Sequence, residues 1–169
     1  MLKYVFLILI AILVAAAVYL YLMPGDAVPA IDPKNATYEI EEKQVTLTDG
    51  TSIVQDATSK TITAYFGNEA KGDLDGDGDE DIAFILIQNG GGSGTFVYAV
   101  AALNTGKGYI GTNGILLGDR IAPQTTGIQD GMILVNYADR LPDEPMAARP
   151  SVGVTLRAKV VDGRLTVVE

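Results

Sequence analysis

The sequence lacks three residue types that carry much of enzyme and metal chemistry: histidine, cysteine and tryptophan. Without histidine there is no imidazole base, no Ser-His-Asp triad and no imidazole ligand for zinc or iron. Without cysteine there is no thiolate nucleophile, disulfide, iron–sulfur cluster, thiolate zinc site or cysteine-linked lipid. Chemistry is left to carboxylates, hydroxyls, lysine, arginine and the backbone. The 169 residues suit one domain, since domains usually have roughly 100–200 residues.

Apolar residues make up 48% of the chain, and many of them lie in one run near its start. Tyr4 to Met23 are twenty consecutive residues without a charged side chain. As a helix that rises ~1.5 Å per residue, this run would be about 30 Å long, the thickness of the hydrocarbon core of a bilayer. The sequence therefore predicts a transmembrane anchor over residues 1–23. A cleaved signal peptide is the alternative, but the apolar region of such peptides usually has only ~7–15 residues.

Charged residues on either side of this run predict its orientation. Lys3 and the amino terminus precede it, while Asp26 and Asp32 follow it. Because positive charge favours the cytoplasmic side, we expect the N-terminus in the cytoplasm and residues 24–169 outside it. If the segment were cleaved as a signal peptide, residues 24–169 would be secreted or periplasmic.

The net charge of the exported part narrows the classes of partner. Residues 24–169 hold all 21 acidic side chains and 11 of the 12 basic ones, so their formal charge is −10. A nucleic-acid partner is excluded, because such binders need a basic footprint. Attraction to anionic lipid is disfavoured for the same reason. The charge suggests a cation as partner, although acidity alone more often serves solubility than a specific ligand.

Past the anchor, the sequence pattern is that of a β protein. Residues 24–37 contain three prolines and are expected to form a linker, followed by one extracytoplasmic β-rich domain over residues 38–169. Short β-type runs alternate with turns, which predicts a mainly β fold, an antiparallel sheet or sandwich with room for one short helix. The expected strands are Tyr38–Leu47, Ser52–Val54, Thr61–Phe66, Ile82–Gln88, Thr95–Leu103, Ile115–Leu117, Gln124–Ile128, Met132–Tyr137, Val152–Val161 and Leu165–Val168.

Two of these runs predict the centre of the sheet. Ile82–Gln88 and Thr95–Leu103 are almost entirely apolar, which is typical of strands buried on both faces. The segment Asn89–Gly94 between them is long and flexible enough for a hairpin loop. Tight turns are expected at three Asp-Gly dipeptides: Asp49-Gly50, Asp130-Gly131 and Asp162-Gly163.

The densest charge in the chain predicts a metal site. Six acidic side chains lie within nine residues, in the segment Asp73-Leu-Asp75-Gly-Asp77-Gly78-Asp79-Glu80-Asp81. Carboxylates at alternate positions can converge on one hard cation if a glycine lets the loop turn sharply, and such oxygen ligands favour Ca²⁺ over zinc or a redox metal. The alternative is a hydrated acidic turn without a metal.

The spacing is not that of an EF-hand, because the twelfth position is Phe84 instead of glutamate and a strand follows instead of a helix. The pattern Asp-x-Asp-x-Asp-Gly-x-x-Asp before an apolar strand resembles the calcium loops of FG-GAP repeats in integrin-type propellers. That resemblance implies side-chain ligands from Asp73, Asp75, Asp77 and Asp81, and a carbonyl ligand from Asp79. The motif occurs once, so it does not imply a propeller. A structural calcium that fixes the start of the following strand is expected.

Two glycine-rich patterns carry no nucleotide-binding prediction. Gly90–Thr95 lacks the lysine of a phosphate-binding loop and is followed by a strand instead of a helix. Gly106–Gly111 matches GxGxxG but also lacks a following helix.

Two Asp-Arg pairs form a second candidate site. Asp119-Arg120 and Asp139-Arg140 each follow an apolar strand, so ion pairs at turns are the ordinary interpretation. In the alternative interpretation, both pairs and Tyr137 lie together at one end of the sheet and form a functional polar site. Two carboxylates there could hydrolyse a glycosidic bond.

The order of the motifs resembles a family of uncharacterised extracytoplasmic bacterial proteins. The segments are NATYEI with VTLTDG, GDLDGDGDEDIAFIL, GGGSGTFVYAVAAL, GYIGTNGILLGDRIAPQTT, and VNYADRLPDEPM with PSVGV, and the resemblance covers most of residues 35–169. The resemblance implies a bacterial envelope location and no particular reaction; some relatives carry lysozyme-inhibitor-like modules. Cysteines near the loop of some relatives are absent from Leu141–Pro150 here, so another contact must hold that loop.

These observations favour a binding or structural role over catalysis. The predicted protein is anchored in the membrane by its N-terminal helix and carries a calcium-stabilised β domain in the bacterial envelope, where its expected partner is an envelope protein or glycan. Two alternatives remain open: a carboxylate-dependent hydrolase that acts on envelope glycans, and a tethered inhibitor of a cell-wall enzyme.

Overall fold

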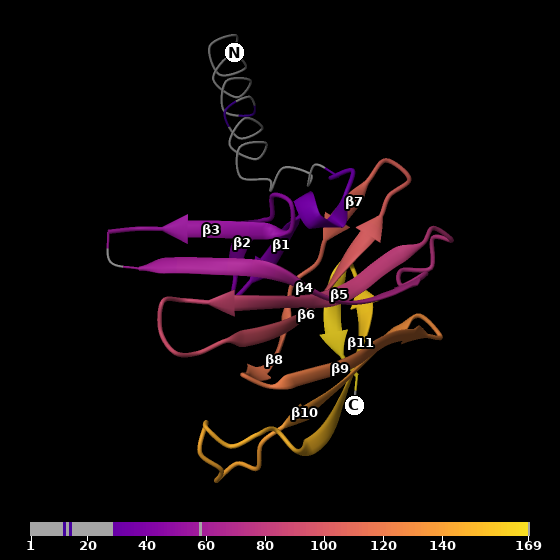
Figure 1. Cartoon of the computed structure of the whole chain (residues 1–169). Helices are drawn as coiled ribbons and strands as arrows, with labels where there is room; N and C mark the ends of the chain where they lie inside the picture. Colours follow the sequence, from indigo (N-terminus) through magenta and orange to yellow (C-terminus); the bar gives the residue numbers. More distant parts are fainter. Residues whose placement is uncertain (1–11, 13, 15–28, 58, 169) are drawn as a thin grey trace.

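The computed structural model describes residues 12, 14, 29–57 and 59–168, and confirms a mainly β, antiparallel fold (Figure 1). A short 3₁₀ turn, η1 (Pro33–Asn35), precedes the strands. The strands are β1 (Thr37–Ile40), β2 (Lys43–Thr46), β3 (Thr51–Gln55), β4 (Lys60–Gly72), β5 (Asp81–Asn89), β6 (Phe96–Asn104), β7 (Tyr109–Gly111), β8 (Ile115–Asp119), β9 (Ala122–Gln129), β10 (Met132–Asp139), β11 (Val152–Val161) and β12 (Arg164–Val167).

The anchor expected over residues 1–23 lies outside the described residues, apart from Ile12 and Val14, which are helical. Within the described part of the chain, no helix combines the length and the apolar character needed to span a bilayer.

The strands form three antiparallel sheets. The largest has the order β3-β4-β5-β6-β7, and β8 pairs with β6 next to β7. A second sheet has the order β12-β11-β10-β9, and β1 and β2 form a hairpin of their own. Figure 1 shows β9 and β10 below β5 and β6, with β1 and β2 above them. The six-stranded sheet is therefore the middle layer of three.

Strands β5 and β6 are apolar along their length because each contributes to two cores. Alternate residues of β5 point to opposite faces of the sheet. Phe84 and Leu86 pack against the β1–β2 hairpin in one core. Ala83 and Ile85 pack against the four-stranded sheet in the other. The prediction that these two strands are central and buried on both faces is confirmed.

Tight turns join neighbouring strands at two of the three predicted Asp-Gly dipeptides. Asp130-Gly131 connects the paired strands β9 and β10, and Asp162-Gly163 connects β11 and β12. All four residues have positive φ, the backbone geometry that this hairpin turn requires. Asp49-Gly50 also turns the chain, and Thr48 and Thr51 on either side exchange two hydrogen bonds. Beyond these two bonds, the strands on either side of this turn do not pair with each other, because β2 pairs with β1 and β3 pairs with β4.

The prediction of one strand over Tyr38–Leu47 is wrong. The segment forms the two strands β1 and β2, joined by a turn at Glu41 and Glu42, whose φ values are 50° and 63°. Two consecutive glutamates with positive φ are uncommon, because their side chains crowd the backbone in the left-handed region. Contacts with the rest of the fold therefore decide this turn more than local preference does.

The second half of the expected linker, residues 24–37, is bonded to the β domain. Ala30 and Tyr109 exchange two backbone hydrogen bonds of 2.8 and 2.6 Å. Pro33 is buried, and its carbonyl accepts a 2.6 Å hydrogen bond from the Tyr38 hydroxyl. The part of residues 24–37 that the structure describes thus packs against the domain, and Tyr109 lies in β7, a strand that the sequence pattern did not predict.

Candidate metal centre

The acidic segment forms the loop that connects β4 to β5. Leu74 is only 5% exposed and packs into the core between the two larger sheets, which fixes the loop to the body of the protein. Asp81 is the first residue of β5 and has no exposed surface. The loop therefore has a buried residue near each end and exposed carboxylates between them.

Asp81 is held by backbone donors from two directions. Its Oδ2 accepts a hydrogen bond of 2.8 Å from the Leu74 N–H, and its Oδ1 accepts one of 2.8 Å from the Asn104 N–H at the end of β6. Burial raises the pKa of Asp81, and the nearby Asp75 and Asp77 raise it further, while the two backbone donors oppose that rise. A buried carboxylate that faces other carboxylates gains from a cation beside it.

The loop is wrapped around Asp73. The two oxygens of this carboxylate accept hydrogen bonds from the N–H groups of Gly76 and Gly78, at 2.7 and 3.2 Å. Both glycines have positive φ, 85° and 91°, which a side chain would disfavour. Asp75 in turn accepts a hydrogen bond from the Asp77 N–H at 3.2 Å. These contacts set the turn without using all the acceptor sites of the carboxylates.

Three of the five predicted metal residues come together. One carboxylate oxygen each from Asp73, Asp75 and Asp81 lies within 4.8 Å of the others. Such a set can supply three oxygen ligands to one hard cation. Asp77 is outside this group, and its carboxylate accepts a hydrogen bond from the Asp79 N–H at 2.8 Å. The side chain of Asp79 is also outside it and approaches Gly106, where a Cβ atom would lie 3.4 Å from it.

Asn104 is the residue of this centre that the sequence did not reveal. It lies 23 residues beyond Asp81 and holds that carboxylate through its backbone N–H, a contact that the side-chain type does not indicate. Pairing of β5 with β6 brings it next to the loop, with Ile82 opposite Ala102. Glu80, the remaining acidic residue of the segment, forms an exposed ion pair with Lys71 at 3.2 Å.

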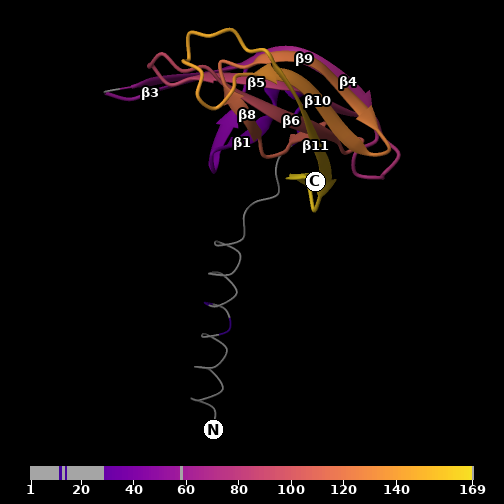
Figure 2. The ribbon, with the colours of Figure 1, turned by 90° about the horizontal axis from the view of Figure 1, so that it is seen from below.

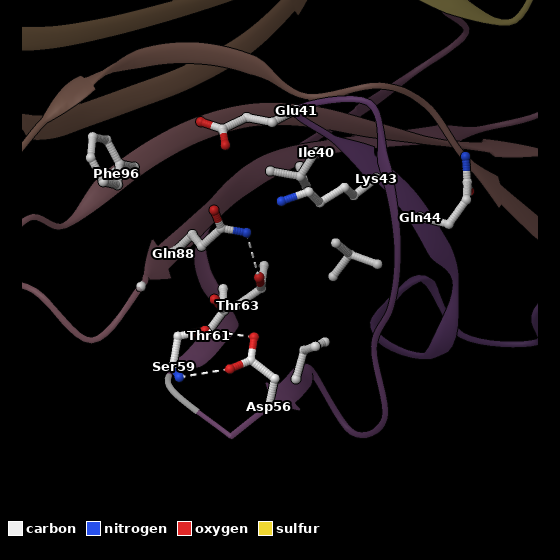
Figure 3. Close-up of a pocket in the computed structure, with 13 residues that line it drawn as sticks. Ile40, Glu41, Lys43, Gln44, Asp56, Ser59, Thr61, Thr63, Gln88 and Phe96 are labelled. Carbon is white, nitrogen blue, oxygen red and sulfur yellow. Dashed lines mark hydrogen bonds between the residues drawn. The ribbon is translucent and has the colours of Figure 1, made fainter.

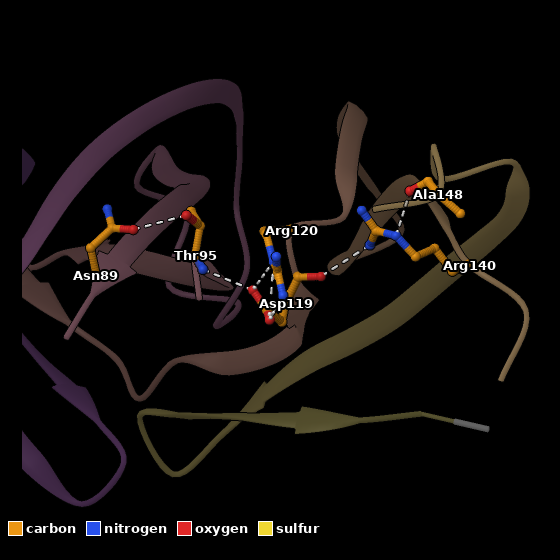
Figure 4. A network of polar contacts seen from close by, with 6 residues as sticks. All are labelled: Asn89, Thr95, Asp119, Arg120, Arg140 and Ala148. Atoms are coloured by element: carbon orange, nitrogen blue, oxygen red, sulfur yellow. Dashed lines mark hydrogen bonds and ion pairs between the residues drawn. The ribbon is translucent and has the colours of Figure 1, made fainter. Parts of the chain in front are cut away.

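The second predicted site is a network of contacts at the other end of the sheet (Figure 4). Asp119 accepts hydrogen bonds from the Arg120 guanidinium at 3.1–3.3 Å and from the Thr95 N–H at 2.8 Å. These contacts, first of all the one with Arg120, lower the pKa of Asp119. Thr95 also donates its hydroxyl to the Asn89 side chain at 2.8 Å, so Asp119 helps to close the glycine-rich hairpin loop.

Arg140 holds the proline-rich loop Leu141–Pro150 in place. Its Nε donates to the Ala148 carbonyl at 2.7 Å, and its Nη1 donates to the Asp119 carbonyl at 3.3 Å (Figure 4). The loop is thereby fixed by a guanidinium where a disulfide is impossible. Asp139 accepts a 2.7 Å hydrogen bond from the Arg140 N–H.

The four residues of the two Asp-Arg pairs thus meet at one end of the molecule, and a shallow hollow of about 280 Å³ is lined by Asp119, Asp139 and Arg140. Tyr137 is 9% exposed and belongs to the core; its burial, with a smaller effect of Asp139, raises its pKa.

Glycoside hydrolysis needs one carboxyl group with a raised pKa as proton donor. The lowered pKa of Asp119 opposes that role, and its contacts are those of a structural network.

Comparisons of the chain with protein-family models, with curated proteins and with solved structures give no match.

Proposed function

We propose that this chain is a membrane-anchored extracytoplasmic protein whose β domain is stabilised by one bound Ca²⁺ and has a binding or structural role in a bacterial envelope. The observation that carries the calcium proposal is the convergence of Asp73, Asp75 and Asp81 within 4.8 Å at the start of β5. Carboxylates at this separation repel one another, and a divalent cation between them replaces that repulsion with attraction.

The ligand chemistry favours calcium. The three converging side chains offer only oxygen, and Ca²⁺ takes six to eight oxygen ligands in flexible geometry that backbone carbonyls and water can complete. A structural role is supported by Asp81, which bonds the loop at Leu74 and the adjacent strand at Asn104. An ion at this carboxylate would join β4, β5 and β6 at one point.

The location rests on the sequence. The uncharged run Tyr4–Met23 has the length of a bilayer span, and the resemblance to extracytoplasmic bacterial proteins agrees with export. The two described residues of the run, Ile12 and Val14, are helical and expose 59% and 57% of their surface. Exposed apolar side chains on a helix are suited to contact with lipid.

The calcium proposal is tested by thermal unfolding of the full chain in detergent, in chelator and in millimolar Ca²⁺. Calcium should raise the midpoint, since an ion at about 100 times its dissociation constant adds about 2.7 kcal/mol. Asp75→Asn should reduce the rise, because it removes one negative charge from the ligand set. The variant should still fold, because Asp75 is exposed and its one hydrogen bond needs only an oxygen acceptor that asparagine keeps.

Asp79→Asn is the matched control, because the Asp79 carboxylate is outside the converging group. This variant should keep the rise in midpoint. The proposal fails if the wild-type midpoint does not move with calcium, or if both variants lose the rise equally.

The location is tested separately by fractionation and N-terminal sequencing of the protein expressed in a bacterium. An intact N-terminus in the membrane fraction supports the anchor. A shortened chain in the soluble exported fraction would show that residues 1–23 are removed as a signal peptide.

A further inference from the structure

A groove of about 400 Å³ lies on the face of the six-stranded sheet, beside the β1–β2 hairpin (Figure 3). Its floor is a row of side chains on three neighbouring strands: Thr63 of β4 lies opposite Gln88 of β5, which lies opposite Phe96 of β6. Thr61 lies two residues before Thr63 and therefore on the same face. The β1–β2 hairpin forms one wall and the β3–β4 turn the other. In Figure 1 and Figure 2, β3 projects to one side of the molecule.

Two polar groups of the groove are held in fixed positions. The amide nitrogen of Gln88 donates to the Thr63 hydroxyl at 3.0 Å, which turns the amide oxygen of Gln88 toward Glu41 in Figure 3. Glu41 accepts a 2.9 Å hydrogen bond from the Tyr98 hydroxyl through Oε1. Its second oxygen has no hydrogen-bond partner among the residues that the structure describes. Acceptors fixed in this way bind a ligand hydroxyl with little loss of side-chain entropy.

Charges of both signs line the groove. Lys43 extends into it and forms no ion pair within the described part of the chain. Glu41 and Asp56 contribute carboxylates to the same lining. A ligand with a strong charge of either sign would meet a like charge here. Hydroxyl groups can donate to the carboxylates and accept from the ammonium group, so a neutral, hydroxyl-rich ligand satisfies both.

The groove also offers apolar surface at its edge. The ring of Phe96 is 36% exposed and lies close to the backbone of Gly94, where an added Cβ atom would come within 3.1 Å of the ring. Val54 in β3 is 60% exposed on the opposite side. Sugar rings present C–H groups on their faces and hydroxyls around their rims. An aromatic ring beside fixed acceptors is complementary to that combination.

We propose that this groove binds a short neutral oligosaccharide, with one sugar ring stacked on Phe96 and its hydroxyls bonded to Gln88, Glu41 and Thr61. Its volume falls in the range of about 300–1,000 Å³ that is usual for small-ligand sites. The groove shares no residue with the loop Asp73–Asp81, so this proposal is independent of the calcium proposal.

The test is calorimetric titration of the full chain with four trisaccharides. Two are neutral, chitotriose and cellotriose; the glucosamine trimer is cationic and trigalacturonate is anionic. At least one neutral trisaccharide should bind with a dissociation constant below about 10 mM, and each charged one should bind about tenfold more weakly or not at all. The proposal is overturned if neither neutral trisaccharide binds, or if a charged one binds as tightly as the neutral ones.

Variants locate the site. Phe96→Ala should weaken binding about tenfold, because the stacking surface is lost. Phe66→Ala is the matched control, since Phe66 is 49% exposed on β4 and lies outside the groove. Thr61→Val keeps the shape and strand preference of the floor and removes only a hydroxyl, so it should fold and weaken binding about threefold. An equal loss in Phe66→Ala, or unchanged binding in both Phe96→Ala and Thr61→Val, places the sugar elsewhere and refutes the proposal.

Discussion

The Oδ1 atom of Asp81 accepts a hydrogen bond of 2.8 Å from the backbone N–H of Asn104, at the far end of the neighbouring strand. The other oxygen of the same carboxylate bonds the Leu74 N–H. One buried side chain thus joins the acidic loop to the two central strands. Since a buried carboxylate is costly unless donors surround it, these two amides account for the place of Asp81 in the core.

Asp81→Asn should lower the free energy of unfolding in chelator by about 1–3 kcal/mol, because an amide has one oxygen and leaves the second backbone donor facing an NH₂ group. Asp79→Asn is the control and should change it by less than about 0.5 kcal/mol. Urea unfolding measures both. A more stable Asp81→Asn variant would show that burial of the charge outweighs its two hydrogen bonds.

The pKa of Asp119 should lie below its ordinary value, mainly because Arg120 donates to the charged form. An unfolded aspartate titrates near ~3.9, so Asp119 contributes stability above that pH and loses it as the pH falls through the lower pKa of the folded state. Carboxyl NMR titration measures the pKa directly. Arg120→Gln should raise it, and an unchanged pKa would contradict the assigned cause.

Arg140→Met should loosen the loop Leu141–Pro150, because the variant keeps the length of the side chain but loses the donors to Ala148 and Asp119. We expect a loss of about 1–2 kcal/mol in the free energy of unfolding. Hydrogen exchange across the loop, followed by mass spectrometry, should become faster. Arg157→Met, at an exposed position on β11, should leave the exchange of the loop unchanged.

Gly111→Ala should destabilise the protein by about 1–3 kcal/mol, because a Cβ atom there would overlap the Thr37 carbonyl and lie 2.6 Å from the Tyr38 ring. Gly127 is also in a strand, and a Cβ atom there would meet nothing within 4 Å. Gly127→Ala should therefore change stability by less than about 0.5 kcal/mol. Thermal unfolding compares the two, and equal effects would contradict the close packing of β1 against β7.

Local sequence patterns predicted the elements whose conformation depends on residues adjacent in the sequence. The continuous apolar run Ile82–Gln88 marked a strand with cores on both faces. The Asp-Gly dipeptides marked the turns at residues 130–131 and 162–163, because this pair adopts positive φ easily. Of the five metal residues that the acidic spacing predicted, Asp73, Asp75 and Asp81 have carboxylate oxygens within 4.8 Å of one another.

The β1–β2 hairpin was missed although the sequence carries a signal for it. Tyr38 and Ile40 are buried on even positions, whereas Val45 and Leu47 are buried on odd ones. In a straight strand these pairs would face opposite sides of the sheet. A two-residue turn at positions 41 and 42 restores them to one core, but two glutamates gave no sign of a turn.

Other features depend on contacts that no local pattern records. β7 has only three residues and is defined by its pairing with β6. The groove beside Phe96 is lined by residues from the six strands β1 to β6 and from three of the connections between them, which no local pattern in the sequence brings together. Asp77 has the spacing of a metal ligand, yet its carboxylate accepts a hydrogen bond from the backbone N–H of Asp79.

The two hydrogen bonds between Ala30 and Tyr109 also decide where the molecule would bear mechanical load. Tension on the chain ahead of Ala30 passes first to these bonds and then to β7, an edge strand of the six-stranded sheet. Strands β5 and β6, which carry both cores, lie farther along the path of force. If the molecule is pulled by its N-terminal end, the hydrogen bonds between Ala30 and Tyr109 should therefore break first. Strands β5 and β6 would separate only at a later stage.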